Sequence, residues 1–230
     1  MDNTIGKGYK MKIYAEFIND ESLMFRTRTL LQFGDSWDLI GSIIMKNPGS
    51  AKPGNKIDSE ICKKLSKYYN EIINLDNWFV SEGDSTMRDI EPIFNGNYVS
   101  KDFELNGVIQ IFNLFNICEP KLNSAFEKAN TTNSIFLLPN VEEMINSFQN
   151  KPVYLGFFDF YTNKKSNHFS FLQESANKIF EFVKTSKFNY FQFEDIIDNA
   201  FYHPQFLNKP TKREKYLATL EKFAKFYESN

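Results

Sequence analysis

Three short runs of apolar residues constrain the fold more than any other feature of this sequence. They occupy residues 43–45, 107–117 and 153–158, and each is nearly continuous, which is typical of strands buried on both faces of a sheet. Between them lie segments whose apolar residues recur at helical spacing. Strands that alternate with helices indicate a parallel sheet between helical layers. With a further short strand at residues 200–207, we predict an α/β fold: a three-layer sandwich with a central, mostly parallel four-stranded sheet.

Capping residues indicate where the helices begin. The predicted starts are, in chain order, Asp58 or Ser59, Asp84 or Ser85 (a turn ended by Pro92), Asn140 with Glu143, His168, and Thr211 with Glu214 as a capping box. Residues 12–17 and 23–33 are rich in β-forming residues and predict a hairpin that extends or flanks the main sheet. We therefore treat residues 1–230 as one domain, with residues 1–36 as an N-terminal hairpin extension.

Composition narrows the range of functions. The 230 residues carry a formal net charge of -2, which argues against a protein that coats nucleic acid indiscriminately but allows a local basic face. Cys62 and Cys118 lie far apart, and the chain has only 2 His, so we expect reduced thiols, no metal and no cofactor. No stretch resembles a signal peptide or a membrane span. We expect a cytoplasmic monomer that makes no membrane contact.

The first apolar run stops abruptly in the loop that begins Lys46-Asn47-Pro48-Gly49. Pro48 fixes φ and donates no N–H, while Gly49 lets the backbone approach a ligand or take a positive φ. Asn47 is therefore expected at the carboxyl end of the strand, with its amide pointing out of the sheet. In an α/β fold this is where ligands bind. An ordinary strand-ending turn would use the same residues.

Two later stretches carry polar groups where a sheet would place them near this loop. Asn113 and Asn116 interrupt the second apolar run, and a buried Asn needs hydrogen-bond partners, either the protein's own backbone or a ligand. The stretch from His203 to Leu207 presents a histidine before a proline. A proline-containing turn with Phe206 and Leu207 in the core is the alternative for that stretch.

Taken in order, these three stretches resemble the uracil-DNA glycosylase superfamily. Lys46-Asn47-Pro48-Gly49 resembles the first motif in its mismatch-specific form, Ile-Asn-Pro-Gly. Ile111-Phe112-Asn113 resembles the apolar strand that ends in the base-reading Asn, and the stretch from His203 to Leu207 resembles the motif His-Pro-Ser-Pro-Leu. The resemblance covers residues 43 to the C-terminus. It leaves out the N-terminal hairpin, and the segment between residues 160 and 200 is longer than the family leads us to expect.

The resemblance implies a role for each matching residue. Asn47 would hold the attacking water and His203 would donate to the carbonyl oxygen of the leaving base, which makes these two the catalytic residues. Leu207 would be an apolar wedge that holds the flipped nucleotide out of the helix. The implied base-binding residues are Gly49, Asn113, Phe112 and Asn116, and the implied DNA-binding residues are Lys46, Ser50, Leu207, Lys209, Lys212 and Arg213.

Gly49 bears on the choice of base. The uracil-specific branch has an aromatic residue there that walls off the 5-position of the pyrimidine, whereas glycine leaves that wall open. Bacterial anti-phage glycosylases that remove glucosylated 5-hydroxymethylcytosine from viral DNA are similar to this superfamily. We therefore expect a glycosylase that excises a modified pyrimidine, with that base in phage DNA as the leading candidate. A repair glycosylase for uracil or mismatched pyrimidines, and a non-catalytic nucleic-acid or nucleotide-binding protein, remain alternatives.

Overall fold

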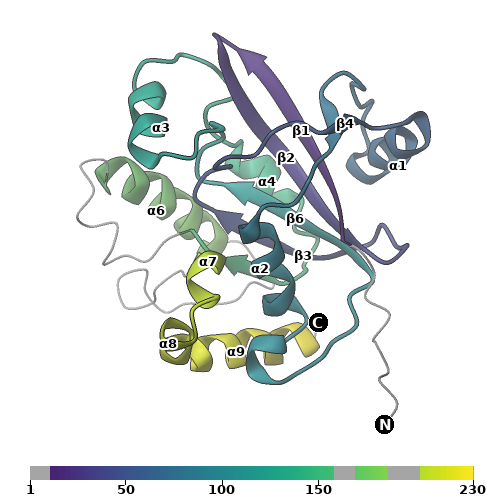
Figure 1. Cartoon of the computed structure of the whole chain (residues 1–230), viewed down its shortest axis with the longest axis vertical. Coiled ribbons are helices and arrows are strands. Elements are labelled where there is room, and N and C mark those ends of the chain that lie inside the picture. Colours follow the sequence, from purple (N-terminus) through teal and green to yellow (C-terminus); the bar gives the residue numbers. More distant parts are fainter. Residues whose placement is uncertain (1–10, 158–168, 186–202, 230) are drawn as a thin grey trace.

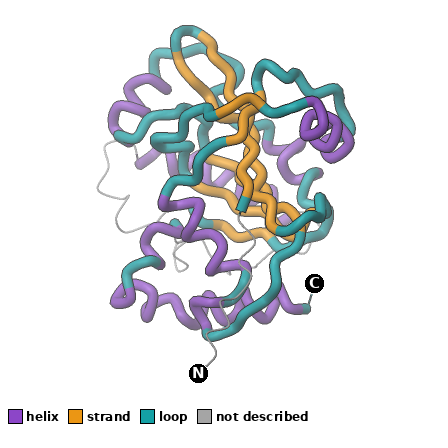
Figure 2. The backbone as a smooth tube through the Cα atoms, turned by 45° about the vertical axis from the view of Figure 1, so that its right-hand side comes forward, coloured by secondary structure: helices purple, strands orange, loops and turns teal. Residues whose placement is uncertain are grey.

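The structure is a computed structural model that describes residues 11–157, 169–185 and 203–229. In these ranges the strands form one seven-stranded mixed sheet with the order β4-β5-β1-β2-β6-β3-β7. Figures 1 and 2 show this sheet with helices on both sides. The predicted α/β class is confirmed, but the sheet is larger and more mixed than the four-stranded sheet expected. The strands are β1 (Lys12–Asp20), β2 (Leu23–Phe33), β3 (Leu39–Met45), β4 (Asn55–Lys56), β5 (Trp78–Val80), β6 (Gly107–Asn113) and β7 (Val153–Leu155).

The three apolar runs form the parallel part of the sheet. β3 lies between β6 and β7 and pairs in parallel with both, so that Met45 is opposite Asn113 and Ile44 is opposite Leu155. Because β3 has neighbours on either side that come later in the chain, its carboxyl end is a topological switch point, where open α/β sheets bind ligands. The other pairings are antiparallel, including β2 with β6, which the sequence did not predict.

The predicted N-terminal hairpin is present and belongs to the main sheet. Glu21 and Ser22 both have positive φ, 47° and 63°, as a two-residue type I′ turn requires. Pairing of β2 with β6 joins the hairpin to the parallel strands. The register between β1 and β2 shifts because Glu16 pairs with Arg28 and Phe17 pairs with Arg26. Thr27 is thus an extra residue, a β-bulge in β2.

Helices cover both faces of the sheet. α1 packs its Leu65 with Tyr14 and Leu30, which defines the α1 face. α2 packs Met87 and Ile90 in one cluster with Ile13. Ile13 precedes Tyr14 on β1, so it points to the opposite face of the sheet, which we call the α2 face. Figure 1 shows α7, α8 and α9 grouped beside α2. The helices are α1 (Ser59–Tyr69), α2 (Ser85–Phe94), α3 (Leu122–Ala129), α4 (Val141–Asn146), α6 (Phe169–Thr185), α7 (Pro204–Leu207), α8 (Pro210–Arg213) and α9 (Leu217–Glu228), with short 3₁₀ turns η1 (Asn97–Val99) and η2 (Glu214–Tyr216).

Three of the predicted caps are confirmed. The side chains of Asp58, Asp84 and Asn140 each accept a hydrogen bond from the backbone three residues on, at the starts of α1, α2 and α4. Two boundaries differ from prediction. α2 continues through Pro92 to Phe94, and the last helix begins at Leu217 because α8 and a 3₁₀ turn precede it.

The strand predicted at residues 200–207 is wrong for its second half. Residues 204–207 form the helical turn α7, with His203 as the N-cap residue and Pro204 in its first turn. A proline at that position is pre-set for a helix because its φ is fixed and it has no N–H that needs a partner. Residues 200–202 lie outside the described ranges.

Candidate active site

A cavity of about 260 Å³ lies at the carboxyl end of β3. It brings together five parts of the chain that are distant in sequence: β2 at Arg26, the end of β3 with the loop after it, the start of α2, the start of α3, and α7 with the residue before it. The lining residues are Arg26, Met45, Lys46, Asn47, Pro48, Gly49, Asp84, Thr86, Met87, Pro120, Leu122, His203, Gln205 and Phe206.

Asn47 is held in place by bonds to the loop after β6. Its Nδ2 donates to the carbonyl oxygen of Glu119 at 3.0 Å. The backbone N–H of Leu114 donates to the carbonyls of Met45 (2.8 Å) and Lys46 (3.0 Å), so the ends of β3 and β6 are tied together. With its nitrogen engaged, the amide of Asn47 offers its oxygen as an acceptor for a water or a ligand group.

Gly49 leaves the wall of the cavity open. Its φ is +62°, a conformation that glycine adopts without strain, and a Cβ built on it would meet no atom of the described structure within 4 Å. A side chain at this position would therefore extend into free space beside Asn47. The role of Gly49 as an open wall for a pyrimidine stays a prediction.

His203 is half-buried, and its ring takes a defined tautomer. Nδ1 accepts from the backbone N–H of Gln205 at 3.4 Å, which caps α7. Burial, together with the positive charge of Lys46, lowers the pKa of His203 to about 3. The ring is therefore neutral at pH 7. A neutral imidazole that accepts at Nδ1 carries its proton on Nε2, so His203 is a hydrogen-bond donor that does not carry charge.

Arg26 is a cavity residue that the sequence did not identify. It is only 2% exposed, and its Nε and Nη1 are buried without a hydrogen-bond partner in the described part of the chain. Asp84 lines the same cavity but makes no ion pair with Arg26 among these residues. Burial lowers the pKa of Arg26, while Cys118 and Asp84 oppose that shift. A strict alternation along β2 would have placed Arg26 on the same face as Arg28, so only the bulge at Thr27 explains its position.

The base-binding residues predicted on and after β6 do not join Asn47 in this cavity. Asn113 pairs with Met45 but is only 2% exposed and does not line the cavity, although its Oδ1 has no partner among the described residues. Phe112 and Asn116 line a separate cavity of about 590 Å³ on the α1 face. Alternation along β6 accounts for this, because Phe112 and Asn113 point to opposite faces.

The predicted wedge is wrong. Leu207 is 0% exposed and belongs to the core, because α7 turns it inward. Gln205, which is exposed, and Phe206, which is half-buried, line the cavity instead.

The other predicted DNA contacts are scattered. Lys46 lines the cavity with Asn47, and Lys209 is exposed just after α7. Ser50 is exposed and lines an adjoining cavity of about 570 Å³. Arg213 lies over the ring of Tyr98, 5.0 Å from its centroid, and is half-buried. The side chain of Lys212 lies outside what the structure describes.

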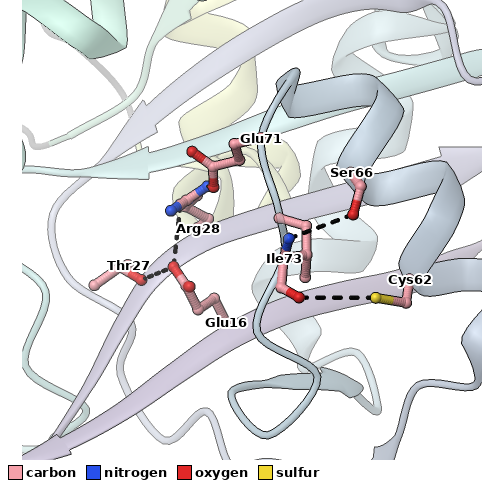
Figure 3. A network of polar contacts seen from close by, with 7 residues as sticks. All are labelled: Glu16, Thr27, Arg28, Cys62, Ser66, Glu71 and Ile73. Carbon is pink, nitrogen blue, oxygen red and sulfur yellow. Dashed lines mark hydrogen bonds and ion pairs between the residues drawn. The ribbon is translucent and has the colours of Figure 1, made fainter.

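The α1 face carries a polar network of a different kind (Figure 3). Glu16, which is 7% exposed, accepts from Thr27 Oγ1 at 2.6 Å and pairs with Arg28 Nε at 3.1 Å. Arg28 also pairs with Glu71 and lies over the ring of Tyr69, 4.9 Å from its centroid. Although burial alone would lower the pKa of Arg28, the charge of Glu16 and the contact with Glu71 raise it. This arginine is fully neutralised.

Comparisons with known proteins do not assign the chain to a family: no family model matches it, and neither the curated proteins nor the solved structures contain a significant match. In the described ranges, no three His, Cys, Asp or Glu side chains are grouped as a metal site would require. None of the helices described is long and apolar enough to span a bilayer. The function must therefore be argued from the cavity itself.

Proposed function

We propose that this protein is a DNA glycosylase, which hydrolyses the N-glycosidic bond of a flipped-out pyrimidine and leaves an abasic site. One observation carries the proposal. Asn47-Pro48-Gly49 and His203, which belong to motifs at opposite ends of the chain, line the same cavity at the carboxyl end of β3. The resemblance assigns Asn47 and His203 to one reaction, which requires that they lie in one cavity although they are far apart in sequence.

The chemistry of the cavity fits this reaction. Breaking an N-glycosidic bond places negative charge on the departing base and positive charge on the sugar. The Nε2–H of neutral His203 donates to the carbonyl oxygen of the base, where the negative charge develops. The free oxygen of Asn47 orients the attacking water, but an amide cannot remove a proton as a carboxylate does. Stabilisation of the leaving group therefore supplies most of the catalysis.

A pyrimidine that carries a substituent at its 5-position is the substrate that the cavity accommodates best. Gly49 leaves free space beside Asn47. The adjoining cavity of about 570 Å³ shares Arg26, Asp84 and Met87 with the first, so room continues beyond the base. Glucosylated 5-hydroxymethylcytosine in phage DNA is the first substrate to test, and it would make the protein an anti-phage defence enzyme.

The test uses oligonucleotides that each contain uracil, 5-hydroxymethylcytosine or its glucosylated form, in single strands and duplexes. Base release is read as strand cleavage after alkali. The expected result is cleavage at the glucosylated base by the wild type and none by Asn47→Ala. Release of uracil alone would support the repair alternative, and no release from any substrate would overturn the proposal.

Variants at Gly49 separate the shape of the wall from the conformation of the backbone. Gly49→Ala and Gly49→Tyr share the strain of a positive φ, but only tyrosine adds a ring beside Asn47. We expect Gly49→Tyr to suppress release of 5-substituted bases and to spare an unsubstituted base, while Gly49→Ala spares both. Equal losses on both substrates would contradict the open-wall interpretation.

A further inference from the structure

We propose that the cavity binds a planar organic anion through Arg26. The anion site itself follows from the position of Arg26 and its neighbours. Only the identity of the anion as the departing pyrimidine rests on the proposed function. Arg26 would then be a third catalytic residue beside Asn47 and His203, and it would act on the same leaving group as His203.

The first reason is that Arg26 is buried without compensation. The residue is 2% exposed, and two of its three guanidinium nitrogens are buried with no partner in the described structure. A charge removed from water without a partner is strongly destabilising, so buried arginines are normally paired and hydrogen-bonded. Because Arg26 also lines the cavity, an acceptor or an anion bound there is the partner that its guanidinium lacks.

The second reason is the charge of the surrounding groups. Lys46 adds a positive charge at the same cavity, and His203 is neutral. Asp84 is the carboxylate that lines the described cavity with Arg26, and its Oδ1 accepts from the N–H of Met87 at 2.9 Å, at the start of α2. Because Asp84 makes no ion pair with Arg26 in the described ranges, it leaves the guanidinium able to take a negatively charged ligand.

The third reason is the contrast with the neighbouring Arg28, whose charge is neutralised by carboxylates. Arg28, two residues later on β2, is paired with Glu16 and Glu71 on the α1 face. The bulge at Thr27 turns Arg26 away from those carboxylates and into the cavity. Bulges are common next to active sites, where they redirect a side chain.

In the proposed reaction, Arg26 would stabilise charge without transferring a proton. The bond between C1′ and the base nitrogen breaks, and both electrons stay on the base. The oxygen of water forms the new bond to C1′ and releases a proton to solution, and the base takes up a proton after it leaves. A guanidinium keeps its proton throughout and donates its hydrogen bonds in the plane of the group, which suits a planar anion.

The test compares two probes with the same ring by titration calorimetry at pH 7: barbiturate, an anionic pyrimidine, and uracil, which is neutral. We expect the wild type to bind barbiturate about tenfold or more tightly than uracil, as hydrogen bonds to a charged group predict. Arg26→Met should lose this preference, and Arg26→Lys, which keeps the charge but lacks the planar fork, should retain part of it. Arg28→Met is the matched control and should leave the preference unchanged.

The outcomes distinguish this inference from the proposed function. Equal affinity of the wild type for both probes, no binding of either, or a preference that survives in Arg26→Met would overturn the anion site. If Arg26→Met binds neither probe, Arg26→Gln, which is also uncharged, takes its place in the test. A preference for barbiturate that survives in Arg26→Gln would overturn the anion site. A preference that depends on Arg26 in a protein that releases no base from DNA would support the anion site and remove the glycosylase function. Base release that is unaffected in Arg26→Met would overturn its catalytic role.

Discussion

Arg26 and Arg28 lie two residues apart on β2, and the sheet separates them into two different environments. On the α1 face, Arg28 is held by Glu16 and Glu71 and lies over the ring of Tyr69. On the α2 face, Arg26 is more deeply buried and has no partner for its Nε and Nη1 in the part of the chain described. A paired charge can contribute to stability, whereas an unpaired buried charge lowers it. Under the proposed function, the network around Arg28 on the α1 face contributes stability and the cavity at Arg26 on the α2 face binds the ligand.

The largest expected effect concerns His203 in the cavity at the carboxyl end of β3. His203→Ala should reduce base release about 100- to 1000-fold, as loss of one donor to a developing anion does. Its melting temperature should change little, because the side chain is half-buried and its hydrogen bond to Gln205, within the described ranges, is a long contact of 3.4 Å. Single-turnover rates on a single-stranded oligonucleotide and thermal unfolding measure the two effects. A variant that unfolds but keeps its rate per folded molecule would place His203 among the structural residues.

On the α1 face we expect the opposite pattern, in which a substitution lowers stability and leaves base release unchanged. Arg28→Met leaves the buried carboxylate of Glu16 without its cation, and we expect a loss of about 2 kcal/mol in the free energy of unfolding. Base release by the folded enzyme should not change. Denaturant unfolding at pH 7 measures the loss.

Lys64→Met is the control for Arg28→Met. The pair between Lys64 and Glu60 joins exposed side chains at i,i+4 on α1 and should contribute less than about 0.5 kcal/mol. If the two variants lose the same small amount of stability, the network on the α1 face has no special role.

Arg26→Met should change stability less than Arg28→Met does, and in the opposite direction. It removes an uncompensated buried charge and replaces it with an apolar side chain of similar length, so we expect the protein to gain about 1 kcal/mol. Base release should fall at the same time. Denaturant unfolding and the single-turnover rate, measured on the same preparation, check both parts. A loss of stability together with a normal rate would make Arg26 equivalent to Arg28 and remove the contrast between the two faces.

Much of this arrangement could be predicted from local sequence. The three apolar runs became β3, β6 and β7, because continuous apolar strands need cover on both faces. Asp58, Asp84 and Asn140 cap helices as expected, since capping depends on neighbouring residues alone. The order of motifs was enough to bring Asn47 and His203 into one prediction, and both line one cavity.

The features that local sequence could not predict depend on how the strands pair and on their register. The bulge at Thr27 arises from how β2 meets β1, so the orientation of Arg26 is not visible in β2 itself. The resemblance places Phe112 and Asn113 in one base pocket, whereas adjacent residues of a strand point to opposite faces. The resemblance to the motif His-Pro-Ser-Pro-Leu makes Leu207 a wedge, whereas Pro204 starts a helical turn that buries Leu207.

The smallest expected effect is a rate that does not change with pH. Burial and the charge of Lys46 hold the pKa of His203 near 3, so its donor form is fully populated from pH 8 to pH 5. Single-turnover base release should therefore be flat over this range. An ordinary histidine would titrate near 6.5 and change the rate there. A change of about tenfold in rate between pH 7 and pH 5, absent in His203→Ala, would contradict the assigned ionisation state.

The same shift makes stability depend on pH, in a direction that can be worked out. The unfolded chain protonates His203 below about 6.5, whereas the folded protein does not do so until about 3. Between these values the unfolded state binds more protons, so stability is complete above pH 6.5 and falls as the pH is lowered towards 3. The slope from this residue is at most about 1.4 kcal/mol per pH unit. His203→Ala should remove this part of the slope, so its stability should exceed that of the wild type increasingly below pH 6. Parallel stability curves for the two proteins between pH 7 and pH 4 would show that His203 titrates normally, and its role as a neutral donor would then have to be abandoned.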